Sequence, residues 1–168
     1  MTPRRLFALD QNFPEPVCKA LEQWLPADLV PVRQIDPRLS EVDDWQLLLA
    51  LHQDSRPWDG LITNDDSMLN LPKEMVVLSQ TGLTLVVAKG EGHSPIKSIG
   101  VVLCHLSHIC HQTVPSRPQI WNLSVRQKAE DRVADYLEKI AHGEKTTVQG
   151  LIEAHRLSPG ELQSKPRV

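Results

Sequence analysis

Short apolar segments alternate with segments of helical periodicity along most of the chain. The apolar runs have the length of buried strands, and the last is rich in β-branched residues. Between them, apolar residues recur at three- and four-residue spacing, as on one face of a helix. Strands are predicted at 6–9, 29–32, 61–63 and 84–88. Helices are predicted at 14–24, at 72–79 and from Pro95 to Ile109, and a further helix is predicted to start after a cap at Ser40 or Asp43. Strands interleaved with helices predict an α/β fold with a parallel sheet covered on both faces.

The C-terminal third has a different composition. Residues 113–123 are rich in proline and polar residues and are predicted to form a linker after an α/β domain at 1–112. A helix is predicted at 124–141, with a thin apolar seam. The polar tail after Gly143 is expected to fray, so 124–168 is predicted to be a helical extension. The apolar seam is formed by Val125, Val133, Leu137 and Ile140.

Composition narrows the class of protein. The 168 residues match one domain, and 40% hydrophobic with 23% charged residues is ordinary for a globular fold. A net charge of −3 lacks the basic footprint of a DNA-coating protein, although bound divalent metals can supply local positive charge. Three irregularly spaced cysteines make no disulfide framework. With no signal peptide and no apolar run of membrane-spanning length, a cytoplasmic protein without membrane contact is expected.

Acidic residues follow two of the predicted strands and precede a helix. Asp10 ends the first strand, and Asp65 and Asp66 follow the third. Ligands of parallel α/β sheets bind outside the carboxyl ends of the strands, so these acids are expected to converge. A further group, Glu41, Asp43 and Asp44, lies at the start of the second predicted helix. Helix capping and turn formation explain the same residues equally well, and Glu41 is best explained as a solvated loop carboxylate.

Converging carboxylates would repel one another unless a cation lay between them. Hard oxygen ligands suit Mg²⁺ or Mn²⁺, and such ions activate water and stabilise the leaving oxygen of a phosphodiester. The acidic residues therefore indicate metal-dependent phosphodiester hydrolysis as the candidate chemistry.

Three motifs, taken in order, resemble the PIN-like domain, and more narrowly the compact PIN-like proteins related to toxin–antitoxin ribonucleases. The motifs are Leu-Asp-Gln-Asn-Phe-Pro at 9–14, Glu-Val-Asp-Asp-Trp at 41–45 and Ile-Thr-Asn-Asp-Asp-Ser-Met-Leu at 62–69. The resemblance covers about residues 4–112. It implies a three-layer α/β/α sandwich, Mg²⁺ or Mn²⁺ as cofactor, RNA as substrate, and an antitoxin protein and a second copy of the chain as candidate partners.

The resemblance also assigns roles to individual residues. Asp10 and Asp65 match metal ligands, and the acid at the helix start is Asp43 or Asp44. Asn12 matches a polar position beside the site, and Thr63 is expected to hydrogen-bond around the metal cluster.

Two positions depart from the family pattern. Gln11 replaces an acid that is frequent in the subgroup, and Ser67 stands where many members have a second aspartate. The fourth carboxylate is therefore either Asp66 or missing, which leaves open a catalytically impaired PIN-like subunit that binds or assembles.

Other features carry weaker indications. Lys89, His93 and Lys97 flank a glycine-containing turn and are candidate RNA-phosphate contacts. The run from Cys104 to His111 places potential zinc ligands on one helix face, although packing explains it better.

An alternative class is a receiver-type signalling module, which also has aspartates at its strand ends and in which Lys89 would match the strand-end lysine. That class needs a further strand carrying Ser or Thr between Asp66 and Lys89. The 124–141 helix is the candidate dimer seam.

Overall fold

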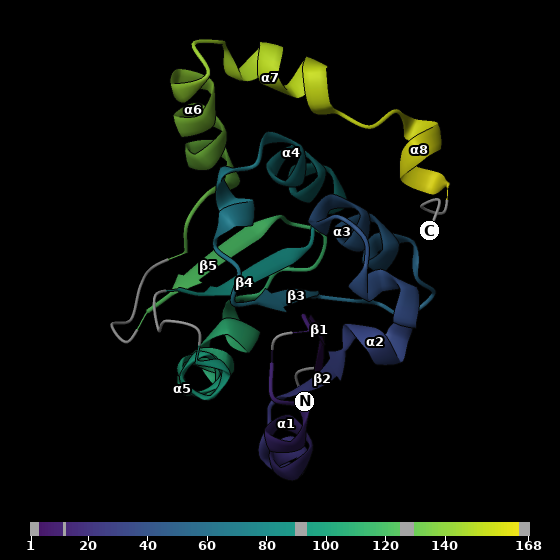
Figure 1. Ribbon diagram of the computed structural model, residues 1–168, viewed down its shortest axis with the longest axis vertical. Helices are drawn as coiled ribbons and strands as arrows, with labels where there is room; N and C mark the ends of the chain where they lie inside the picture. The colour runs from purple at the N-terminus through teal and green to yellow at the C-terminus, as the bar shows by residue number, and fades with distance from the viewer. Residues whose placement is uncertain (1–3, 12, 90–93, 125–129, 165–168) are drawn as a thin grey trace.

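A computed structural model describes residues 4–11, 13–89, 94–124 and 130–164 of the chain. Its centre is a five-stranded sheet in which all the paired strands are parallel (Figure 1). The order across the sheet is β2-β1-β3-β4-β5. The strands are β1 (Arg5–Leu9), β2 (Ala27–Pro31), β3 (Gly60–Thr63), β4 (Thr84–Ala88) and β5 (Gln119–Leu123).

Helices and 3-10 turns connect successive strands and cover both faces of the sheet. This arrangement confirms the predicted α/β fold and is compatible with a three-layer α/β/α sandwich. None of the helices in the described part of the chain is long and apolar enough to cross a membrane. The helical elements are α1 (Glu15–Leu21), η1 (Glu22–Trp24), α2 (Val32–Ile35), η2 (Pro37–Ser40), α3 (Asp44–Gln53), η3 (Ser67–Asn70), α4 (Pro72–Thr81), α5 (Pro95–Gln112), α6 (Val133–Gly143), α7 (Val148–His155) and α8 (Pro159–Gln163).

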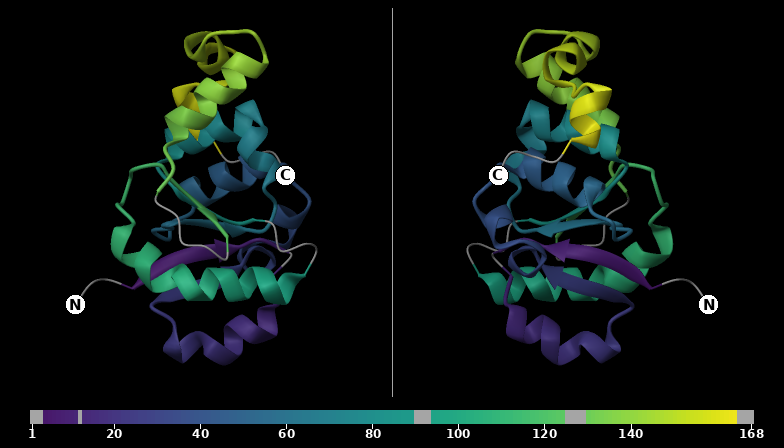
Figure 2. Two further views of the ribbon diagram at one scale, coloured as in Figure 1. Left: turned by 90° about the vertical axis from the view of Figure 1, so that its left-hand side faces the viewer. Right: turned by 90° about the vertical axis from the view of Figure 1, so that its right-hand side faces the viewer.

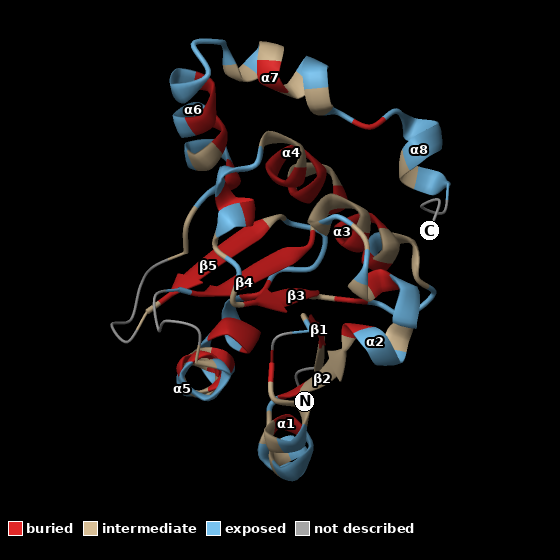
Figure 3. Ribbon diagram, in the orientation of Figure 1, coloured by how far each residue is buried: buried red, intermediate tan, exposed pale blue. Residues whose placement is uncertain are grey.

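Alternating strand residues build a separate apolar core on each face of the sheet. Leu85 and Val87 of β4 face the core formed with α3, α4 and α6, whereas Val86 and Ala88 face the core formed with α1 and α5. Strands β3, β4 and β5 are buried on both faces (Figure 3). Of these, β3 and β4 are continuous apolar runs in the sequence, which is why the pattern predicted them.

The fifth strand corrects the predicted domain boundary. Residues 113–123, expected to be a linker, contain β5, which pairs with β4 along its whole length. The strand begins directly after Pro118, and the buried Gln119 side chain fixes its start by donating to the Gln112 carbonyl and accepting from the Val114 N–H. The α/β unit therefore extends beyond residue 112, because the prolines precede a strand rather than separating domains.

The C-terminal segment also differs from its prediction. The helix expected at 124–141 begins only at Val133, and Val125 lies outside the described residues. The predicted polar tail contains α7 and α8, and it docks through Leu157, whose backbone N–H and carbonyl both bond the Gln80 side chain. Figures 1 and 2 show α6 and α7 beside α4, at the end of the molecule opposite α1. The apolar seam of α6 is buried inside the chain's own core, so it is no longer a free dimer surface.

Candidate functional site

The candidate site lies at the carboxyl ends of β1 and β3. In the sheet, β2 is the neighbour of β1 in one direction and β3 is its neighbour in the other. The strand order therefore reverses between β1 and β3, which makes this the topological switch point. Ligands of open α/β sheets bind at such a point. Asp10 directly follows β1, and its backbone N–H continues the ladder by donating to the Ile62 carbonyl at 2.9 Å. This places the Asp10 side chain beside the end of β3.

Thr63 links the acids that follow the two strands. Its side chain is 1% exposed, and its Oγ1 donates to Asp10 Oδ2 at 2.8 Å. The same Oγ1 accepts the Asp65 backbone N–H at 3.0 Å. Asp65 in turn accepts the Ser67 N–H on Oδ1 at 2.8 Å. The hydroxyl therefore orients Asp10 and fixes the turn that carries Asp65, while both carboxylates keep lone pairs for a further ligand.

Asp44 completes the cluster from the first turn of α3. The pKa of this half-buried carboxyl is raised from 3.8 to about 6, mainly by burial and then by the nearby charges of Asp10, Asp65, Glu74 and Asp43. Two of those charges belong to Asp10 and Asp65, so the three segments lie near enough for their carboxylates to influence one another. Sequence reasoning left open which of Asp43 and Asp44 faces the strand ends, and the burial and electrostatics of Asp44 favour that residue.

The neighbouring acids have other surroundings. Asp43 is exposed at the N-cap of α3, where its backbone N–H donates to Gln46 Oε1 at 3.1 Å, which is half of a capping box. Glu41 is exposed after η2, in agreement with its interpretation as a solvated carboxylate. Asp66 turns toward Lys89, with 3.7 Å between Oδ2 and Nζ. Capping accounts for Asp43, ion pairing for Asp66 and solvent exposure for Glu41.

Two residues near the cluster were missed by the sequence analysis. Glu74, in the first turn of α4, is 8% exposed, and its pKa is raised mainly by burial and also by the charge of Asp43. Arg33 lines the same small cavity as Asp10, with Gln11, Phe13 and Glu15, and its guanidinium pairs with the Glu15 carboxylate. The sequence offers a signal for Glu74, an acid in the first turn after a helix-starting proline, but none for Arg33.

The predicted substrate contacts are only partly described. Lys97 is exposed in the first turn of α5, which is the next element after β4 along the chain. Asn12 and His93 lie outside the described residues. In the Cys104–His111 run, α5 buries Leu106, Ile109 and Cys110 against the sheet, and the His108 ring meets the edge of Trp121 at a centroid distance of 5.5 Å. Packing thus accounts for Leu106, Ile109 and Cys110, whereas Cys104, His108 and His111 are exposed.

The donor set of Asp10, Asp44 and Asp65 suits a hard divalent cation. All three are carboxylates, and a cation among them would relieve the repulsion that Asp44 experiences from Asp10 and Asp65. Among the described residues, no three His, Cys, Asp or Glu side chains stand close enough together to hold an ion as they are placed. Binding would therefore have to draw the carboxylates toward a common point.

The receiver-type alternative needs a strand between Asp66 and Lys89. The residues between these two are all described, and they form only η3, α4 and β4 itself. Because β3 and β4 are neighbours in the sheet, Lys89 follows the strand directly next to the one that Asp66 follows. The extra Ser/Thr-bearing strand is absent from that described segment. The strand order itself is shared by proteins of many functions, so the site rather than the topology must carry the assignment.

Comparisons of the chain with protein-family models, with curated proteins and with solved structures found no match.

Proposed function

We propose that the protein is a PIN-like, Mg²⁺- or Mn²⁺-dependent endoribonuclease. The observation that carries this proposal is the link that Thr63 makes between Asp10 and the turn of Asp65 at the switch point of the sheet, with Asp44 near enough for both acids to raise its pKa. Capping and turn formation explain acids at each position separately. They do not explain why the charges of Asp10, Asp65 and Glu74, from three separate segments, all raise the pKa of the half-buried Asp44. That repulsion costs stability unless a cation offsets it.

Each residue has a role that follows from its contacts. Asp10, Asp44 and Asp65 would hold the metal, which when bound supplies an activated water and stabilises the leaving oxygen. Thr63 holds Asp10 in place and fixes the turn before Asp65. Arg33, beside Asp10, supplies a positive charge for an RNA phosphate. Lys89 is the partner of Asp66, which keeps this fourth acid at the margin of the site.

Cleavage of a labelled single-stranded RNA by the purified chain tests this function. We expect cleavage in Mg²⁺ or Mn²⁺, none in EDTA, and a loss of more than about 100-fold in Asp10→Asn, since removing a partner of a metal ligand alone already costs 10–100-fold. Asp135→Asn, an exposed carboxylate of α6 paired with Arg132, is the matched control and should cleave normally. Equal cleavage by wild type and Asp10→Asn would exclude the proposed site.

A second candidate function is a PIN-like subunit that binds RNA or a protein such as an antitoxin without cutting. Ser67 in place of an acid, and carboxylates that are not gathered around a common point, favour it. Metal-independent RNA binding with no cleavage in either metal would support this candidate over the nuclease.

A further inference from the structure

A polar hollow lies where the chain leaves the edge of β5 and enters α6, outside the acids of the proposed nuclease site. It has a volume of about 310 Å³ and is lined by Asp131, Asp135, Tyr136 and Lys139. The Asp131 N–H donates to the Ile120 carbonyl of β5 at 3.0 Å, which fixes this side of the hollow to the sheet. We call it the β5–α6 hollow, and its volume is that of a small-ligand site, which starts at about 300 Å³.

The Asp131 carboxylate in this hollow is held from the buried side. The Tyr136 hydroxyl donates to Asp131 Oδ2 at 2.8 Å and accepts from Asn122 Nδ2 at 3.4 Å. Burial, aided by the bond to Asp131, raises the pKa of Tyr136 to about 12, so the hydroxyl keeps its proton. Asn122 is 7% exposed, and its Oδ1 has no hydrogen-bond partner within the described part of the chain. A buried amide left unsatisfied costs stability, so packing alone does not explain why a polar side chain stands here.

The sheet register places the hollow beside the acids of the proposed site. Thr63 of β3 pairs with Val87 of β4, and Val87 pairs with Asn122 of β5, so the three residues form one row across the sheet. With neighbouring strands about 4.8 Å apart, the backbones of Thr63 and Asn122 are separated by about 10 Å. Val87 faces the core formed with α3, α4 and α6, and α3 is the helix that carries Asp44. The hollow therefore lies on the same face and near the same edge of the sheet as the acids.

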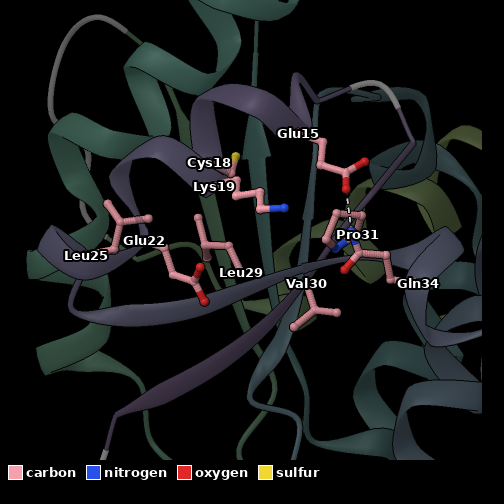
Figure 4. A pocket seen from close by; sticks show the side chains of 9 residues that line it. All are labelled: Glu15, Cys18, Lys19, Glu22, Leu25, Leu29, Val30, Pro31 and Gln34. Atoms are coloured by element: carbon pink, nitrogen blue, oxygen red, sulfur yellow. Dashed lines mark hydrogen bonds between the residues drawn. The ribbon is translucent and has the colours of Figure 1, made fainter.

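The charges around the site favour a path for RNA toward this hollow. Lys89 follows β4, the strand between β3 and β5, and its 3.7 Å pair with Asp66 is about half exposed on both sides, so a phosphate can compete for the ammonium group. At the opposite edge of the sheet, a groove of about 180 Å³ between α1 and β2 presents two carboxylates, Glu15 and Glu22, against one ammonium group, Lys19 (Figure 4). Carboxylates repel phosphates, so a strand bound at the acids is directed toward β5.

The free groups of the hollow match the edge of one base. Asp135 is held by Arg132 through both carboxylate oxygens, at 2.5 and 3.2 Å, whereas Asp131 forms no ion pair with a described residue. A carboxylate accepts two neighbouring donors, and among the RNA bases only guanine presents two, N1–H and N2–H, on its Watson–Crick edge. Lys139 would repel the cationic side chain of a peptide, which is the other ligand suited to a carboxylate.

We propose that the β5–α6 hollow is a base-recognition subsite in which Asp131 binds a guanine close to the phosphate that is cleaved at the acids. Tyr136 and Asn122 are positioning residues that hold the Asp131 carboxylate in place. Lys139 supplies positive charge for a neighbouring phosphate. The identity of the ligand rests on the proposed function, because RNA is the substrate of that site.

Fluorescence anisotropy of the full chain in EDTA tests the subsite without any cleavage. Two labelled uridine-rich RNAs are compared that differ only in one guanosine or inosine, since inosine lacks the N2 amino group. We expect wild type to bind the guanosine RNA about 10-fold more tightly, as for a bidentate contact to a base. Asp131→Asn should remove this preference, and Tyr136→Phe should reduce it without changing the Kd of the inosine RNA. Asp135→Asn removes the same charge from the same hollow but should keep the preference, because Arg132 already occupies that carboxylate.

The comparison of guanosine with inosine on wild type needs no variant, so a misfolded variant leaves it intact. Equal binding of the two RNAs, binding of neither, or a preference that survives in Asp131→Asn would overturn the subsite. An arginine-rich peptide that binds more tightly than the guanosine RNA, and loses affinity in Asp131→Asn, would also overturn it by assigning the hollow to a protein partner. A guanosine preference without cleavage in Mg²⁺ or Mn²⁺ would support the subsite and count against the nuclease, whereas cleavage without the preference would do the reverse.

Discussion

Replacing Asp44 with asparagine should stabilise the metal-free protein at neutral pH. The carboxylate is half-buried among like charges, which raises its pKa from 3.8 to about 6. A native-state pKa above the unfolded-state value means that the folded protein binds the proton more tightly. Ionisation of Asp44 therefore costs stability as the pH rises from about 4 to about 6, and the full cost is present above that range. Asparagine has nearly the same shape and no charge to repel.

The size of the effect follows from that shift. A rise from 3.8 to about 6 corresponds to about 3 kcal/mol at 1.36 kcal/mol per pH unit. Solvent still reaches part of the side chain and screens part of this repulsion, so we expect about 1–2 kcal/mol. For a chain of this length, that gain raises the melting temperature by about 3–6 °C. The loss of a metal ligand should accompany the gain in stability.

Urea unfolding in EDTA at pH 7.5 and pH 4 measures this directly. The Asp44→Asn variant should exceed wild type by much more at pH 7.5 than at pH 4, where Asp44 is protonated in the folded state and only partly ionised in the unfolded state. Asp43→Asn is the control, because Asp43 is exposed and asparagine caps a helix as well as aspartate does, so its change should stay within about 0.5 kcal/mol. A variant that is no more stable than wild type at pH 7.5, or equally stabilised at both pH values, would refute the reasoning.

Three further predictions address the site and the sheet. Thr63→Val removes the bonds to Asp10 and to the Asp65 N–H, so RNA cleavage should fall about 10–100-fold in initial-rate assays, while Thr63→Ser should retain activity. Arg33→Ala should raise KM for RNA and reduce the salt dependence of binding by about one phosphate contact, whereas Arg38→Ala, exposed on η2 and paired with Asp36, should do neither. Gly60→Ala would place a Cβ 1.8 Å from the Thr84 carbonyl oxygen in the centre of the sheet. Thermal unfolding should show a loss of at least about 1–3 kcal/mol, and an unchanged melting temperature would contradict that packing.

The sequence predicted the buried strands whose residues are almost all apolar. Parallel strands such as Thr84–Ala88 are continuous apolar runs, and the helices between them show regular spacing, so both were found from pattern alone. The fifth strand was missed because Gln119 and Asn122 interrupt the apolar run of β5 and two prolines precede it. Both polar side chains are buried, and Gln119 is fully hydrogen-bonded to groups that only the tertiary structure brings near.

The candidate site shows a similar division. Asp10 and Asp65 could be predicted, because strand ends of a parallel sheet share one edge. The choice between Asp43 and Asp44 could not, since it depends on which way the first turn of α3 faces. Arg33 could not be predicted either, because it reaches the Asp10 cavity from α2, which follows the edge strand β2, and spacing along the chain carries no record of that approach.

The placement of charge connects stability with the proposed chemistry. The chain has a net charge of −3, and part of that acidic excess is held together at the carboxyl end of the sheet, where it raises the pKa of Asp44. No ion pair among the described residues neutralises Asp44, whereas the acids at the margin are paired, as Asp66 is with Lys89 and Glu15 with Arg33. Under the proposed function, the positive partner of these central acids would come from outside the chain. If that partner is a divalent cation, its binding should raise the stability of wild type at pH 7.5 more than that of Asp44→Asn, because only wild type has the repulsion to lose.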